Sequence, residues 1–152
     1  MTLSKGKMKR GNLLNYLFIL FGILGLGAMI YSYLAFSINV VSKNSCSINP
    51  EVSCEPVIMS SYSTLLGIKL YYYGMAFFPL MIVLALLSKK SEKITGYLIS
   101  YLSVIAAGIS VYLIYTEIFI IGHICILCTI GHISIFSILI LSLARFKFVW
   151  KE

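Results

Sequence analysis

The sequence predicts an all-α membrane protein, a bundle of four transmembrane helices, and three observations support this fold class. The 152 residues are 60% hydrophobic and only 11% charged, which is far more apolar than an ordinary soluble domain. The apolar residues form four long stretches, each close to the roughly 20 helical residues that cross a membrane. Lipid offers no hydrogen bonds, so every backbone N–H and C=O group in a span must bond within the protein. The stretches lack the alternation of apolar and polar residues that barrel strands show, so helices are expected.

The four spans are expected at about residues 13–36, 70–88, 94–115 and 123–144, in one transmembrane domain covering residues 1–152. The N-terminal run resembles a secretory signal, but no clear small-residue cleavage site follows it. We therefore interpret it as an uncleaved first span. The links between the second and third spans and between the third and fourth are short, so any soluble partner is expected to be another polypeptide.

The connection at about residues 37–69 is the one sizeable loop. Its first half is polar, with Asn49-Pro50 as a turn signal, and Pro56 suits the first turn of a short helix. Its second half is apolar enough to lie in the membrane interface, and Gly67 is expected to act as a helix stop. A short interfacial helix is therefore expected between the first two spans.

The basic residues predict the topology. Ten of the twelve Lys and Arg residues lie in the N-terminal tail, the link between the second and third spans, and the C-terminal tail. By the positive-inside rule these segments face the cytoplasm, so the net charge of +7 indicates orientation and contact with membrane lipid, with no nucleic acid as partner. We expect a multi-pass cell-membrane protein with both termini cytoplasmic and the 37–69 loop outside.

All four cysteines are expected at the non-cytoplasmic face. Cys46 and Cys54 lie in the external loop, and Cys125 and Cys128 form a CxxC motif at the outer end of the fourth span. The i, i+3 spacing brings both sulfurs of the CxxC to one helix face, and a helix N-terminus stabilises a thiolate. Such a pair can cycle between dithiol and disulfide and exchange with the loop pair. A lipid-soluble quinone is the natural endpoint, because it accepts two electrons and two protons.

Two other interpretations of the cysteines remain open at this level. Two structural disulfides would also explain an even number of external cysteines, although a helix fixed in a bundle gains little from an i, i+3 bridge. His123, Cys125, Cys128 and His132 form HxCxxCxxxH, a set of zinc-compatible ligands. On one continuous helix His123 points away from the other three, so we favour redox chemistry over a metal site.

The pattern resembles the vitamin K epoxide reductase family, in its prokaryotic form. The shared features are a cysteine pair in the loop after the first span, a serine six residues beyond it, glycines leading into the second span, and a CxxC at the start of the fourth. In this sequence they are Cys46, Cys54, Ser60, Gly67, Gly74 and "CILC". The resemblance covers about residues 13–145. A related form is fused to a thioredoxin domain, which is not expected in this chain.

The resemblance implies a membrane thiol:quinone oxidoreductase that supports disulfide-bond formation. A separate thioredoxin-like protein would attack Cys46 of a Cys46–Cys54 disulfide, and freed Cys54 would attack Cys125. Cys128, deeper in the helix, would then pass electrons to a quinone such as ubiquinone or menaquinone. The absence of a glycosylation sequon and the compact loop favour a prokaryotic source.

Two positions differ from the vertebrate enzymes of this family. Those enzymes hold the quinone oxygens with a polar residue on the second span and a tyrosine after the CxxC, where this sequence has Leu70 and His132. Loss of the first group argues against vitamin K epoxide as substrate. His132 falls on the same helical arc as Cys125 and Cys128, so its imidazole is a candidate quinone ligand, with bonding to a neighbouring helix as the alternative. Ser60 is a second candidate contact to quinone or to a cysteine sulfur.

The remaining polar and aromatic groups are interpreted more simply. We expect His123 and Glu117 to be solvated near the outer surface, and Tyr71, Tyr72 and Tyr73 to form an interfacial aromatic belt. The alternative function class is a tetraspan structural or adhesion protein whose external loop is braced by a disulfide. That class explains Cys46 and Cys54 but leaves the CxxC unexplained.

Overall fold

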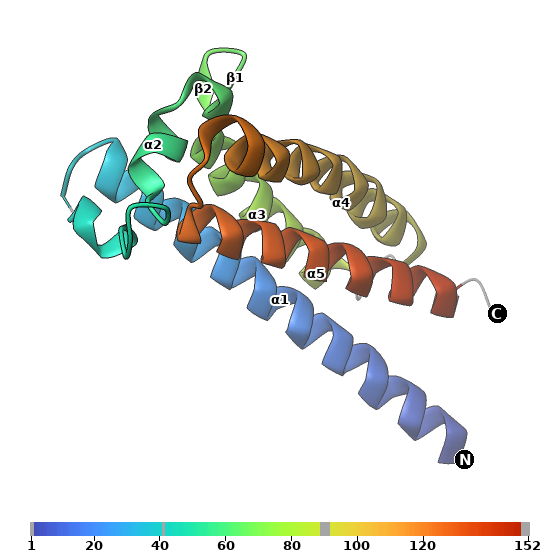
Figure 1. Ribbon diagram of the computed structural model, residues 1–152. Helices are drawn as coiled ribbons and strands as arrows, with labels where there is room; N and C mark the ends of the chain where they lie inside the picture. Colours follow the sequence, from blue (N-terminus) through green and yellow to red (C-terminus); the bar gives the residue numbers. More distant parts are fainter. Residues whose placement is uncertain (1, 41, 89–91, 150–152) are drawn as a thin grey trace.

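The computed structural model describes residues 2–40, 42–88 and 92–149. Its architecture is a bundle of long helices with one elaborated loop at one end (Figure 1). The start of α1 and the end of α5 lie at the other end of the bundle, away from this loop (Figure 1). The predicted all-α, four-helix membrane fold is confirmed.

In the described part of the chain, four helices are long and apolar enough to cross a membrane. Their spanning parts are Gly11–Phe36, Leu70–Leu87, Lys93–Ile121 and Ile126–Lys147. They belong to α1 (Thr2–Phe36), α3 (Leu70–Leu87), α4 (Glu92–Tyr115) with its continuation η3 (Thr116–Ile121), and α5 (Ile126–Val149). Large apolar side chains such as Leu20, Val83 and Ile140 are exposed on the outer helix surfaces. A bundle in water would hide such side chains, whereas in lipid their exposure carries no hydrophobic cost.

Three helix bounds differ from the sequence-based expectation. The helix α5 begins at Ile126 instead of about residue 123, so Cys125 precedes the helix. The helix α1 begins at Thr2, so the basic N-terminal segment continues the first helix instead of forming a separate tail. The third span does not end at Tyr115, because η3 continues it as a π-helix to Ile121. Gly122 then ends the helix in the left-handed conformation, with φ of 70°. The segment expected to be a short link is therefore a part of the third span.

Packing in the bundle depends on small residues where helices approach closely. The helix α1 packs against α3 and α5, and α5 packs against α4. At Gly25 of α1 an added Cβ atom would clash with the Phe78 ring on α3, and at Gly22 it would come within 2.7 Å of Ile82. Close packing of small residues is the usual source of helix association in lipid, where apolar surfaces gain little from burial alone.

The loop between α1 and α3 contains a 3₁₀ turn η1 (Lys43–Cys46), the short helix α2 (Cys54–Met59), the turn η2 (Ser61–Ser63), and an antiparallel hairpin of β1 (Thr64–Leu65) and β2 (Ile68–Lys69). Pro56 lies in the first turn of α2, as predicted. Gly67 does not stop a helix. It forms, with Leu66, the two-residue turn of the hairpin, and both residues have positive φ, as tight hairpin turns require.

Candidate functional site

The two loop cysteines form a disulfide. Cys46 ends η1 and Cys54 begins α2, and their Cα atoms are 5.7 Å apart. The chain between them reverses in a tight turn, in which the amide of Ile48 donates to the carbonyl of Val52 over 3.1 Å. The Asn49-Pro50 turn signal thus has a structural role, because it brings the two cysteines back together.

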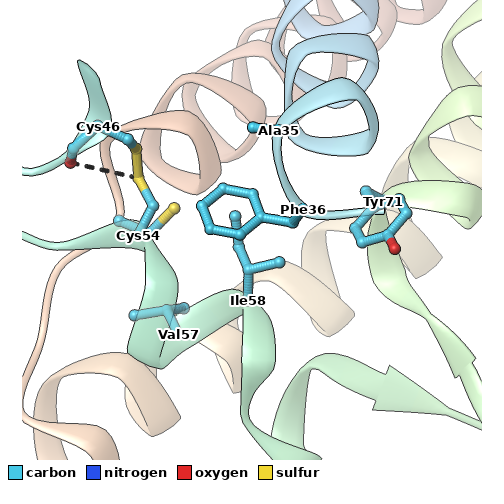
Figure 2. Close-up of a cluster of buried hydrophobic side chains, with 8 residues drawn as sticks. Ala35, Phe36, Cys46, Cys54, Val57, Ile58 and Tyr71 are labelled. Carbon is cyan, nitrogen blue, oxygen red and sulfur yellow. Dashed lines mark hydrogen bonds between the residues drawn. A yellow bond between two sulfur atoms is a disulfide. The ribbon is translucent and has the colours of Figure 1, made fainter. Parts of the chain in front are cut away.

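The disulfide lies in a buried apolar cluster with Ala35 and Phe36 from the end of α1, Val57 and Ile58 from α2, and Tyr71 from α3. Figure 2 shows the disulfide beside the Phe36 ring within this cluster. Cys46 is 3% exposed and Cys54 is fully buried. A soluble thiol can therefore reach Cys46 only when the loop opens, which protects the disulfide from indiscriminate reduction.

Cys125 belongs to the same cluster and lies directly against the loop disulfide. The sulfur atoms of Cys46, Cys54 and Cys125 all lie within 4.8 Å of one another. A backbone hydrogen bond fixes the contact, because the amide of Ile124 donates to the carbonyl of Glu51 in the loop over 3.0 Å. The predicted meeting of the loop pair with the CxxC is thus observed for three of the four sulfurs.

The helix α5 begins at Ile126, so Cys125 occupies the position that caps its N-terminus. Its sulfur accepts a hydrogen bond from the backbone amide of Cys128 at 3.3 Å, in the manner of a capping side chain. Cys125 and Cys128 are free thiols. If Cys125 becomes a thiolate leaving group, its negative charge would be stabilised by this amide and by the positive end of the helix dipole.

Cys128 faces a different environment, a cavity of about 280 Å³ beside the cluster. The cavity is bounded by all four long helices and by α2, and its walls are almost entirely apolar. Cys128 lines it, whereas Cys125 does not. The two sulfurs of one CxxC are therefore divided between the loop disulfide and a lipid-like cavity.

His132 lines the cavity one turn beyond Cys128 and is 8% exposed. Its Nε2 atom is buried and has no hydrogen-bond partner among the described residues. The nearest charged group is Glu117, whose Oε1 lies 3.8 Å from this nitrogen. That distance suits an ion pair but is too long for a hydrogen bond, so Nε2 has no hydrogen-bond partner in this arrangement of the described residues.

The expectation that Glu117 is solvated is wrong. The side chain is 5% exposed and lines the same cavity as Cys128 and His132. The sequence contains a signal for this, because Ser103, Ser110 and Glu117 are polar residues spaced by seven and so share one helix face. In the structure Ser103 and Ser110 are buried as well. The signal was missed because the third span was expected to end at Tyr115.

The other predicted residues are distributed as follows. Ser60 lines the cavity, but its hydroxyl donates to the carbonyl of Val57 at 2.8 Å and no hydrogen bond to a cysteine is seen. Leu70 also lines the cavity, at the start of α3. The aromatic belt is only partly correct, because Tyr72 is exposed while Tyr71 is buried and lines the cavity together with Tyr73.

The alternative zinc site gains no geometric support. His123 precedes α5 and lies in a non-helical segment, half-buried, with its Nδ1 atom buried and unbonded. Within the described part of the chain, the potential metal ligands that gather are Cys46, Cys54 and Cys125, and two of these are joined in the disulfide. The HxCxxCxxxH set therefore does not converge on one point.

A four-span membrane bundle with a loop disulfide packed against a helix-capping CxxC has the architecture of a membrane thiol-disulfide oxidoreductase. Comparison with known families agrees, because the model of the vitamin K epoxide reductase family matches residues 16–143. This match covers most of the chain, and the protein belongs to that family. No curated protein sequence matches the chain.

Proposed function

We propose that the protein is a membrane thiol:quinone oxidoreductase that supports disulfide-bond formation, taking electrons from a separate thioredoxin-like protein. The observation that carries this proposal is the position of Cys125. Its sulfur lies within 4.8 Å of both loop sulfurs, while Cys128 of the same motif opens to the apolar cavity. This arrangement provides a continuous path of thiols from the loop to the membrane interior.

The path begins at the loop disulfide. A thiolate of the reduced partner attacks Cys46, forming a mixed disulfide and releasing Cys54. Cys54 attacks Cys125 of the oxidised CxxC and releases Cys128. The partner's second thiol then frees Cys46 and leaves the partner oxidised, and Cys46 closes the loop disulfide again on Cys54, which frees Cys125. The observed state, with a loop disulfide and two CxxC thiols, corresponds to the end of this sequence.

The cavity has properties that suit a quinone. A cavity of about 150 Å³ can hold benzene, so about 280 Å³ is room for a quinone ring of one or two fused cycles. The walls are apolar, and the unpartnered His132 Nε2 offers a hydrogen bond to one ring oxygen. When bound, the quinone supplies a sink for two electrons and two protons. Cys128 and His132 are the residues we propose to contact it, with Ser60 as a weaker candidate.

The orientation follows from charge and belongs to the proposal. Ten of the twelve basic residues lie in the two terminal tails and in the link between the second and third spans. In a four-span bundle these three segments are on the same side of the membrane. We therefore place both termini in the cytoplasm and the cysteines at the outer face of a prokaryotic cell membrane. In this orientation the loop meets exported thiol proteins, and disulfides persist there.

The test is thiol-dependent reduction of a soluble ubiquinone or menaquinone analogue by the purified protein, followed by quinone absorbance. Wild-type protein should reduce the quinone when a reduced thioredoxin-like protein is supplied. The Cys125→Ala and Cys128→Ala variants should not reduce it. Ser47→Ala, at an exposed position of the loop, serves as a control substitution of similar size and should keep the wild-type rate. Quinone reduction that survives in both cysteine variants would exclude the relay and leave the disulfide-braced tetraspan protein as the alternative.

A further inference from the structure

The exchange path described above does not use Glu117, although this residue is buried beside the CxxC. An isolated carboxylate inside a membrane bundle is costly, so it is normally paired or functional. Two groups near it can share a proton with it: His132 Nε2, which lies 3.8 Å from its Oε1, and the Cys128 thiol on the wall of the same cavity. All three side chains line the same cavity.

Local backbone structure holds Glu117 at this position. It lies in the π-helical segment η3, in which the amide of Gly122 donates to the carbonyl of Glu117 five residues earlier, at 2.9 Å. Such wider turns inside helices occur frequently at functional sites. Directly after η3, Gly122 reverses the chain toward Cys125. The carboxylate and the CxxC are thus positioned by one turn of the chain.

We propose that Glu117 and His132 form a buried proton-transfer pair for the CxxC. This inference rests on the proposed function and names two residues that move protons in it. Oxidation of Cys125 and Cys128 breaks two S–H bonds, forms one S–S bond, and releases two electrons and two protons to a quinone. Glu117 accepts the proton of the Cys128 thiol first and that of the Cys125 thiol second, and passes each to Nε2 of His132, a residue that lines the cavity where the acceptor binds. The carboxylate is regenerated at the end of each cycle.

The surroundings of the pair leave few competing proton carriers. The other titratable side chains that line the cavity are Tyr62, Tyr71 and Tyr73, and no Lys, Arg or Asp lines it within the described residues. Tyrosine hydroxyls ordinarily titrate near pH 10, so they are poor acceptors at neutral pH. Glu117 and His132 are therefore the groups on the cavity wall to which we assign the proton transfer.

The first test measures Cys128 alone and requires no quinone. In a Cys125→Ala background with the loop disulfide intact, Cys128 is the single free thiol, and its alkylation by N-ethylmaleimide is followed by mass spectrometry across a range of pH. A carboxylate that is only a charged neighbour opposes thiolate formation, so Glu117→Gln would then alkylate as fast as the parent or faster. A carboxylate that accepts the thiol proton speeds alkylation, so Glu117→Gln should be about tenfold slower at neutral pH.

Three further variants make this result specific. Glu117→Asp keeps a carboxyl group and should recover part of the rate lost in Glu117→Gln, which separates proton transfer from a folding defect. Glu55→Gln removes an exposed carboxyl group of α2 and should match the parent. His132→Gln should leave alkylation near the parental rate, because the transfer from Cys128 to Glu117 precedes His132.

The second test places the pair in the complete reaction. Glu117→Gln and His132→Gln in the four-cysteine protein should each slow quinone reduction, while both still exchange disulfides between the loop and the CxxC. Alkylation of Cys128 in Glu117→Gln at the parental rate or above overturns the proposed pair, whatever the quinone assay gives. Failure of the wild-type protein to reduce quinone overturns the proposed function instead, and the alkylation result still decides whether Glu117 takes the thiol proton.

Discussion

The two cysteines of the CxxC motif are one helical turn apart, yet they lie in different environments. Cys125 is fully buried against the loop disulfide, whereas Cys128 is partly exposed and lines the apolar cavity. The start of α5 at Ile126 separates them, because Cys125 caps the helix and Cys128 lies inside its first turn. The difference supports the proposed division of labour, in which one sulfur exchanges with protein thiols and the other with a membrane-soluble acceptor.

The groups that surround the two sulfurs also differ. Around Cys125 the contacts are the loop disulfide and apolar side chains, and the hydrogen bond to its sulfur comes from the backbone. Around Cys128 the cavity wall carries the carboxyl group of Glu117 and the imidazole of His132. Thiol exchange needs sulfurs in contact, while reduction of a quinone also needs protons. In the proposed reaction, each cysteine therefore lies beside the groups that its step would require.

The largest effect is expected from removing one sulfur at a time. Cys128→Ala leaves Cys125 facing the loop, so a Cys54–Cys125 disulfide should accumulate and quinone reduction should be abolished. Cys125→Ala should also abolish reduction but without a loop-to-helix disulfide. Non-reducing peptide mapping distinguishes the two, and a Cys54–Cys128 disulfide in the Cys125→Ala variant would show that the sulfurs are interchangeable.

His132→Ala should affect the Cys128 side only. Loss of the imidazole is expected to slow quinone turnover about 100-fold, a common size for a lost acid-base group. Exchange between the loop pair and the CxxC, measured by trapping thiols with a maleimide in the absence of quinone, should be unchanged. Unchanged quinone turnover would instead assign His132 to packing alone.

Filling the cavity beside Cys128 is expected to weaken quinone binding, with a smaller effect than the loss of His132. Ala106 lines the cavity from α4, and Ala106→Phe would crowd it at a cost of about 1–3 kcal/mol, or roughly tenfold or more in quinone affinity. Val104→Phe on the exposed face of α4 is the matched control. The KM for quinone should rise in the first variant and remain at the wild-type value in the second. Equal KM values in both variants would place the acceptor elsewhere.

The smallest effect is expected at Ser60. Its hydroxyl already bonds to the Val57 carbonyl at the end of α2, so Ser60→Ala should cost about 0.5–1.5 kcal/mol of stability through that bond. Quinone turnover should change less than in His132→Ala. If Ser60→Ala slowed quinone turnover as much as His132→Ala while thermal stability stayed near the wild-type value, Ser60 would be assigned a contact with the acceptor in place of its bond to Val57.

Much of the fold could be predicted from the sequence because the relevant signals are local. Hydropathy identified the spans, and Pro56 indicated the first turn of α2. The expectation for Gly67 failed, because positive φ serves a hairpin turn as well as a helix end, and only pairing of β1 with β2 selects the hairpin. The end of the third span was also missed, since a π-helix has no clear pattern of its own in the sequence.

The sequence by itself determined the four membrane helices, the division of the cysteines into a loop pair and a helix-starting CxxC, and the position of His132 one turn beyond it. Only the tertiary structure decided which sulfurs touch, and that Glu117 is buried beside Cys128 and His132. The reason is that helix formation depends on neighbours along the chain, whereas these contacts depend on long-range packing. The bond from Ile124 to Glu51, which joins the start of α5 to the loop, is formed only when α1, α3 and α5 have come together.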